Sequence, residues 1–207
     1  MGKAIHPDLK DLAREQRDRG DFKGAIRTLK EAIDRAGAEL ADLHGIMGGT
    51  QRQQGDLTAA ASAYDAGFHL DERYHAASSY NALNRLLTRV LLEPRSLMNP
   101  DLLRVNQNLE FVNVRQALSE FQKQLERQVK DKRSHDFWCA GDLIVAAALN
   151  GDLRGAARAV KRFDACSPPA FARDAYRNTL AALAQLETPR KEVFMKAEEL
   201  LGATTSL

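Results

Sequence analysis

The chain has 207 residues, and its 30 basic and 28 acidic side chains leave a formal net charge of only +2. Charges so evenly balanced give no overall field that would draw nucleic acid or an anionic membrane to the protein. The two cysteines are too few for a disulfide scaffold. No apolar run approaches the roughly 18 residues that a membrane-spanning helix needs. We therefore expect a soluble, cytoplasmic protein with no membrane partner.

Alanine and leucine recur at helical spacing, while aromatic residues make up only 6% of the chain. This pattern favours an all-α fold of ten helices in five antiparallel hairpins, within one domain that covers residues 1–207. Two hairpins are expected over 7–70, an irregular middle hairpin over 71–133 and two further hairpins over 134–202. Helices are expected over residues 7–20 and 22–36, within the hairpin 39–70, and over 73–93, 100–130, 138–150, 153–163, 170–186 and 189–201. The helix over 170–186 is expected to bury Phe171 and Tyr176.

The stretch 100–130 makes the middle hairpin irregular. Pro100 suits the first position of a helix, and eight apolar residues from Leu102 to Val129 keep near-helical spacing. One unbroken helix is therefore expected here, and it is too long for a standard repeat.

A Gly-Asp pair followed by leucine or phenylalanine falls between two predicted helices three times, at Gly20, Gly55 and Gly151. Glycine suits a tight turn between two helices because it adopts positive φ without steric cost. The first two glycines are 35 residues apart, close to the roughly 34-residue period of tetratricopeptide repeats. The chain therefore resembles the tetratricopeptide (TPR) family, and this resemblance implies a right-handed superhelix of helix hairpins.

Three glycines, Gly45, Gly48 and Gly49, fall in the first predicted helix of the second hairpin. Each weakens a helix by up to about 1 kcal/mol relative to alanine. Either a neighbouring helix packs very close at this point, or the surface stays shallow for a ligand. Close packing is the preferred interpretation.

The middle of the chain carries a second resemblance, to the TRAFs-binding domain. The features that carry it are Tyr74, the pair Asn81-Ala82, the predicted long helix, and Asp136-Phe137-Trp138 ahead of the Gly151 turn. The likeness covers about residues 70–186. That family is a TPR-like region of certain kinase kinase kinases and of many bacterial proteins. It implies a protein-interaction or regulatory solenoid, often joined to an effector domain in bacterial signalling and defence.

In a TPR array the first helices of successive hairpins line a concave groove, so the resemblance implies a binding surface there. Cationic and amide side chains in such a groove would bind an acidic peptide or a carboxylate terminus through charge-assisted hydrogen bonds. Ile46 stands where the full carboxylate-clamp pattern has asparagine. Taken singly, each candidate is better explained as a solvated charge of a helix face. The groove candidates are Lys10, Arg14, Arg17, Arg52, Asn81, Asn84 and Arg85.

A second candidate surface is a basic stripe formed by Arg154, Arg158, Lys161 and Arg162. These residues share one face of a predicted helix, with no acidic residue between them. The basic stripe either keeps an outer face soluble or docks an acidic partner or nucleic acid. Because no aromatic residues are interleaved with it, nucleic acid is the less favoured partner.

His135, Asp136 and Cys139 lie close together at the start of a predicted helix. They suggest a cysteine/histidine nucleophile pair or metal ligands. A zinc site needs three or four ligands, however, and the sequence locates no oxyanion donor for catalysis. Helix capping and packing is the preferred interpretation. We therefore expect no catalytic residues, no metal and no cofactor.

The resulting hypothesis is a protein-binding adaptor or regulatory subunit in bacterial signalling or defence. Its expected partner is another protein, such as an effector enzyme that acts in trans. Self-association stays open, and so do two alternatives: binding through the basic stripe, and cysteine/histidine catalysis.

Overall fold

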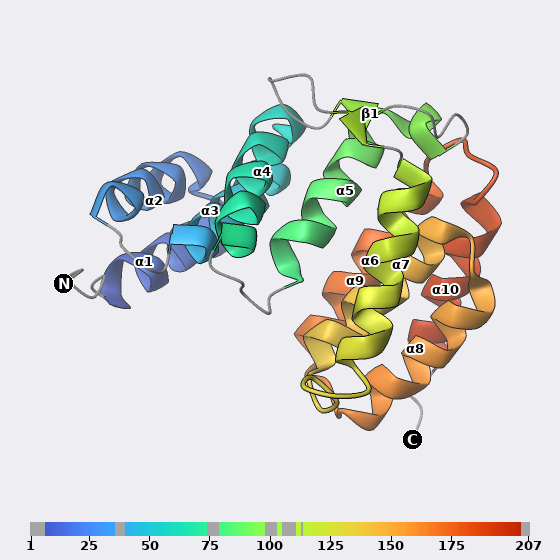
Figure 1. Ribbon diagram of the computed structural model, residues 1–207. Helices are drawn as coiled ribbons and strands as arrows, with labels where there is room; N and C mark the ends of the chain where they lie inside the picture. Colours follow the sequence, from blue (N-terminus) through green and yellow to red (C-terminus); the bar gives the residue numbers. More distant parts are fainter. Residues whose placement is uncertain are drawn as a thin grey trace. The chain divides into compact units, whose positions relative to one another are not determined.

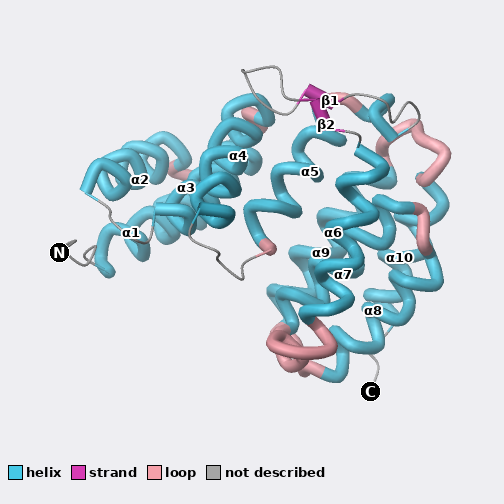
Figure 2. Tube along the Cα trace, viewed as in Figure 1, coloured by secondary structure: helices cyan, strands magenta, loops and turns pink. Residues whose placement is uncertain are grey.

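The computed structural model describes residues 7–35, 40–73, 79–97, 103–104, 111–112 and 114–203. Helices account for nearly all of these residues, as Figure 2 shows, so the predicted all-α class is confirmed. The described elements, labelled in Figure 1, are α1 (Pro7–Asp18), α2 (Phe22–Arg35), α3 (Leu40–Gln54), α4 (Leu57–Arg73), α5 (Tyr80–Leu92), a 3-10 helix η1 (Pro94–Leu97), the strands β1 (Leu103–Arg104) and β2 (Phe111–Val112), α6 (Val114–Gln128), α7 (Phe137–Asn150), α8 (Leu153–Ala165), α9 (Ala170–Ala184) and α10 (Lys191–Ala203). None of the helices in these ranges is long and apolar enough to cross a membrane.

The chain forms two compact units, Met1–Leu92 and Glu93–Leu207. In the first unit α1 packs on α2, α3 packs on α4, and α5 adds to α4. In the second unit α7 packs on α8, α9 packs on α10, and α6 lies against α7. Neighbouring helices therefore pair as the hairpin prediction requires. The single domain and the right-handed superhelix stay predictions.

The three repeated glycines end the first helix of three hairpins. Gly20, Gly55 and Gly151 have φ values of 83°, 90° and 77°, in the left-handed region that favours glycine. At the third turn the Gly151 N–H donates to the Ala148 carbonyl and the Asp152 N–H to the Ala147 carbonyl, each at 2.9 Å. This pair of bonds satisfies carbonyls that a helix end otherwise leaves without a partner.

The aspartate that follows each of these three glycines begins the second helix of its hairpin. The carboxylates of Asp21, Asp56 and Asp152 each accept a hydrogen bond from the backbone N–H three residues later, at 2.9, 2.9 and 2.8 Å. An acidic cap of this kind stabilises a helix start by about 1 kcal/mol. The motif therefore recurs because one residue ends a helix and the next begins another.

The glycines of α3 lie against bulky side chains of α4 and α5. A Cβ added to Gly48 would lie 2.8 to 2.9 Å from ring atoms of Tyr64, and one added to Gly45 would lie 2.8 Å from Oδ1 of Asn81. Tyr64 itself is fully buried. Close packing, and not a shallow ligand surface, accounts for these two glycines.

Helix α7 is the central element of the second unit, because every residue from Cys139 to Leu149 is buried. It packs against α6, α8, α9 and α10. A helix that is apolar on all sides needs such a surrounding layer, and its alanines let the neighbouring helices approach closely. The fixed position of α7 in turn fixes the side chains at its first turn.

The prediction of one unbroken helix over residues 100–130 is wrong. Helix α6 begins only at Val114, and β1 pairs antiparallel with β2 through Leu103 with Val112 and Arg104 with Phe111. Valine and phenylalanine favour strands, and the asparagines between the two strands in the sequence disfavour a helix. The apolar spacing from Leu102 to Leu109 that suggested a helix lies largely outside the described residues.

The expected middle hairpin is divided as well. Helix α5 belongs to the first compact unit and packs on α4, whereas α6 belongs to the second unit and packs on α7. The boundary between the units falls between Leu92 and Glu93. Tyr74, which contributes to the second family resemblance, lies outside the described residues.

Replacement of Gly48 by alanine tests the close packing of α3. The added methyl group must displace the buried Tyr64 ring, so we expect the free energy of unfolding to fall by about 1–3 kcal/mol. Gly202→Ala is the matched control, because a Cβ there makes only ordinary contacts with Arg177. Urea unfolding followed by circular dichroism measures both variants. Equal stability of the two would contradict the packing described here.

Candidate functional site

The three groove candidates of α1 form ion pairs, with Arg14 exposed and Lys10 and Arg17 half-buried. Lys10 Nζ is 2.7 Å from Asp42 Oδ2 of α3, Arg14 pairs with Asp11 at 3.1 Å, and Arg17 pairs with Asp18 at 2.8 Å. Exposed ion pairs contribute at most about 1 kcal/mol, so carboxylates of a partner can replace these acids. The α1 cations therefore stay candidates for partner contact.

The groove candidates of α3 and α5 are bonded to each other and to the core of the first unit. Arg52 Nη1 donates to Asn84 Oδ1 at 3.0 Å, and Arg85 Nε donates to Asp65 Oδ1 at 2.7 Å. Arg89 donates to the second oxygen of Asp65 at 2.6 Å. Because the Asp65 side chain is only 10% exposed, this carboxylate with two arginines is part of the packing of α4 on α5.

Asn81 is likewise buried. Its amide nitrogen donates to Asp71 Oδ2 at 2.8 Å and to the Ala41 carbonyl at 3.2 Å. Burial raises the pKa of the Asp71 carboxyl, and the hydrogen bond from Asn81 opposes that rise. Asn81 therefore joins α3, α4 and α5 and does not face a groove.

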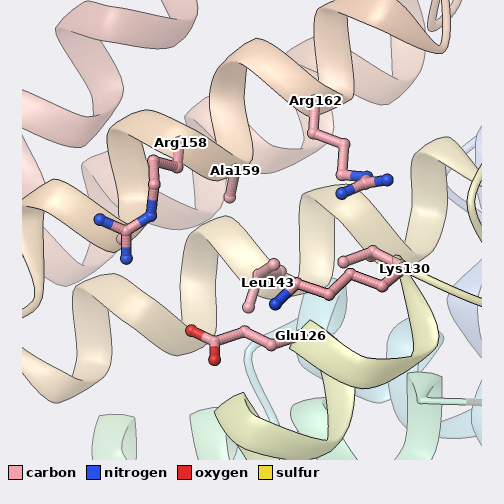
Figure 3. A pocket seen from close by; sticks show the side chains of 8 residues that line it. Glu126, Lys130, Leu143, Arg158, Ala159 and Arg162 are labelled. Carbon is pink, nitrogen blue, oxygen red and sulfur yellow. The ribbon is translucent and has the colours of Figure 1, made fainter.

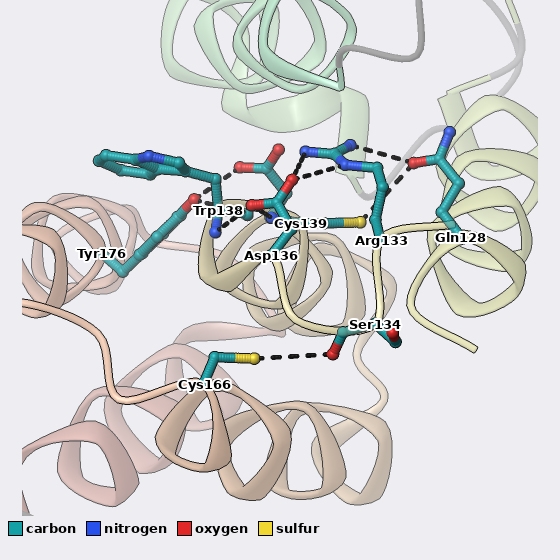
Figure 4. Close-up of polar contacts among 9 residues, drawn as sticks. Gln128, Arg133, Ser134, Asp136, Trp138, Cys139, Cys166 and Tyr176 are labelled. Atoms are coloured by element: carbon teal, nitrogen blue, oxygen red, sulfur yellow. Dashed lines mark hydrogen bonds and ion pairs between the residues drawn. The ribbon is translucent and has the colours of Figure 1, made fainter. Parts of the chain in front are cut away.

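The residues around Cys139 cap and pack a helix, as the preferred interpretation of the sequence predicts. Asp136 accepts hydrogen bonds from the N–H groups of Trp138 at 2.8 Å and Cys139 at 3.2 Å, and so begins α7 (Figure 4). Arg133 holds the second oxygen of Asp136 at 2.7 Å. The Cys139 side chain is fully buried, and burial raises the pKa of its thiol to about 11.

A thiol with so high a pKa is almost entirely protonated at neutral pH, whereas a cysteine nucleophile must be a thiolate. His135 is exposed at the end of the preceding turn. Within the described ranges no three His, Cys, Asp or Glu side chains come together as metal ligands. The geometry therefore gives Cys139 a packing role.

Two exposed aromatic rings lie side by side at the first turns of α7 and α9. Trp138 is 41% exposed and Phe171 is 65% exposed, and their ring centroids are 6.1 Å apart. We call these two residues the aromatic pair. The expectation that Phe171 is buried is wrong, because it lies five positions before Tyr176, about 140° away around the helix at 3.6 residues per turn.

Tyr176 of α9 packs against Trp138 of the aromatic pair. Its ring centroid is 6.0 Å from that of Trp138 and 5.6 Å from that of Phe163. Its hydroxyl lies 2.9 Å from the Trp138 carbonyl oxygen and 2.8 Å from Asp142 Oδ1, as Figure 4 shows for the labelled Trp138 and Tyr176. A Cβ on Gly141 would overlap the Tyr176 ring, so only glycine allows this approach of α9 to α7.

The basic stripe divides between solvent and a cavity. Arg154, Arg158 and Lys161 are exposed and Arg162 is half-buried, and Arg158 and Arg162 line a hollow of about 220 Å³ between α6, α7 and α8. Neither the aromatic pair nor this cavity can be inferred from helical spacing, because each brings together residues from separate segments of the chain. The presence of the chain's single tryptophan at a helix start was the one local signal for the pair.

Comparison with known proteins adds little to this description. No family model matches the chain, and no curated protein matches it. The chain is similar to a solved structure described as "MamA RS-1 ArsTM double mutant", with 16% sequence identity and a TM-score of 0.45, over 99% of this chain and 100% of that one. A likeness at this level carries no argument about function. The fold rests on the helices and turns described above.

The burial of Cys139 predicts slow reaction with thiol reagents. In a Cys166→Ser variant, which leaves Cys139 as the single cysteine, we expect labelling at pH 8 to be about a hundredfold slower in the native chain than in guanidinium. The native rate should keep rising with pH toward the thiol pKa of about 11. Rapid labelling of the folded variant at pH 7 would instead identify a reactive thiolate and revive the cysteine/histidine alternative.

Proposed function

We propose that this chain is a protein-binding module and that the aromatic pair, Trp138 and Phe171, contacts its partner. The observation that carries the proposal is the exposure of two large rings in contact, at 41% and 65%. Exposure of apolar surface to water is unfavourable, and burial of that surface in an interface stabilises a complex by about 25 cal/mol per Å². Tryptophan in particular is enriched among the residues that dominate binding energy.

The ring contacts that position Trp138 favour a role of the pair in binding a partner. Trp138 contacts Phe137, Phe171 and Tyr176, with centroid distances of 5.1, 6.1 and 6.0 Å. Rings that are already held in place lose little further conformational entropy when a partner covers them. The partner segment that fits this surface presents an apolar side chain, such as leucine, methionine or phenylalanine, from a helix or an extended strand.

The pair lies on the helices that the TPR resemblance implicates. Helices α7 and α9 are the first helices of two successive hairpins, and in that family such helices line the binding surface. We extend the proposal to an adaptor or regulatory subunit in bacterial signalling or defence, with a protein partner such as an effector enzyme acting in trans. Lys10, Arg14 and Arg17 are secondary candidates for contact with acidic segments of the partner.

A photo-crosslinking amino acid placed at Phe171 tests this surface in the native host. Benzoylphenylalanine keeps the ring, so we expect one specific crosslinked partner on irradiation. The matched control carries the same amino acid at Met195 of α10, which is 46% exposed. Addition of Trp138→Ala to the Phe171 variant should weaken capture by about tenfold or more, the effect of losing one aromatic hot spot.

Circular dichroism must show that each variant keeps its helical content. Equal crosslinking from Phe171 and Met195 would contradict a partner site at the aromatic pair, and so would capture that is indifferent to Trp138→Ala.

A further inference from the structure

A charged cavity lies between α6, α7 and α8, apart from the aromatic pair (Figure 3). Its volume is about 220 Å³. Sites for drug-sized ligands usually measure roughly 300–1,000 Å³, so this one fits a compact group. The residues that line it are Glu126, Val129, Lys130, Leu143, Gly155, Arg158, Ala159 and Arg162.

Positive charge dominates the lining. Arg158 and Arg162 line it from α8, with their guanidinium groups on opposite sides of Ala159, and Lys130 enters from the turn after α6, with its amino group directed toward Leu143 (Figure 3). Glu126 supplies the only negative charge among the lining residues, which leaves an excess of two positive charges. Such an excess matches a phosphate monoester, whose charge at pH 7 is about −1.5 to −2.

The contacts already made by these side chains leave donors for a ligand. Glu126 Oε1 accepts the Gln122 amide at 3.1 Å, which directs part of this carboxylate toward its own helix. Arg158 is 69% exposed, and its ion pair with Asp152 is long, at 3.9 Å. Within the described part of the chain, the buried Nε of Arg162 has no hydrogen-bond partner. Because that nitrogen has almost no accessible surface, the donors open to a ligand are the other nitrogens of Arg158, Arg162 and Lys130.

The apolar part of the lining strengthens this electrostatic preference. Leu143 and Ala159 lie between the charged groups in Figure 3, and they are 6% and 2% exposed. Charges beside such a surface interact more strongly than charges surrounded by water. Guanidinium groups also match phosphate oxygens geometrically, since each can donate two parallel hydrogen bonds.

We propose that the cavity lined by Lys130, Arg158 and Arg162 binds a phosphate monoester, carried by a small metabolite or by a phosphorylated side chain of a protein. Arg162 binds the phosphate oxygens, the exposed side chain of Arg158 turns toward Arg162 to complete the site, and Lys130 adds charge from the facing wall. With Glu126 included, the lining residues carry an excess of two positive charges, which balances the two negative charges of a phosphate dianion. This site is independent of the aromatic pair, and neither proposal rests on the other.

Isothermal titration with O-phospho-L-serine and with a five-residue phosphoserine peptide tests the site. The pocket variant is Arg158→Gln with Arg162→Gln. The matched control is Arg154→Gln with Lys161→Gln, which removes the same charge from exposed positions of the same helix. We expect the pocket variant to lose affinity by about tenfold or more, and the control by less than about threefold.

Should the pocket variant fail to fold by circular dichroism, Lys130→Gln replaces it, because Lys130 is exposed in a turn. Tighter binding of the peptide than of phosphoserine would identify a phosphorylated protein as the source of the phosphate, and equal binding would identify a small metabolite. An equal loss of affinity in the pocket and control variants would overturn the proposal in favour of diffuse attraction by the basic stripe. Absence of binding by the wild-type chain to both probes would also overturn it.

Discussion

The packing of Tyr176 on Gly141 is the contact on which the second unit depends. A tyrosine ring can reach the backbone of α7 only where a Cβ is absent, and its hydroxyl then meets the Trp138 carbonyl and Asp142. A buried hydroxyl without such acceptors would cost about 1–3 kcal/mol. Because the same ring supports Trp138, the contact that joins α9 to α7 also presents the surface proposed to bind a partner.

The two proposed sites use different parts of the same arrangement. The aromatic pair lies where α7 and α9 begin, whereas the charged cavity lies between α6 and α8 with α7 contributing Leu143. One site offers apolar surface and the other offers positive charge, so they suit different ligands. In the first unit, by contrast, the groove candidates Arg52, Asn81, Asn84 and Arg85 are engaged in packing, whereas those of α1 form ion pairs with neighbouring aspartates.

The turns could be predicted from the sequence because each residue of the Gly-Asp pair has a local reason for its place. Gly151 adopts positive φ, and Asp152 caps the helix that follows. Longer-range features could not be predicted in this way. The strand pair depends on hydrogen bonds between segments and not on periodicity, and the contact of Trp138 with Phe171 depends on how closely α9 approaches α7. The cavity needs Lys130 from a turn and Arg162 from α8, and no spacing along one helix indicates it.

The central claim is that Trp138 is exposed to solvent yet held in place for binding. Trp138 is the single tryptophan of the chain, so its fluorescence can be measured without substitution. Time-resolved anisotropy should show a ring that turns with the whole protein, while iodide still quenches its emission, and Tyr176→Phe should increase the local motion. Free rotation of the ring within nanoseconds in the wild-type chain, as is usual for unrestrained exposed side chains, would contradict the account.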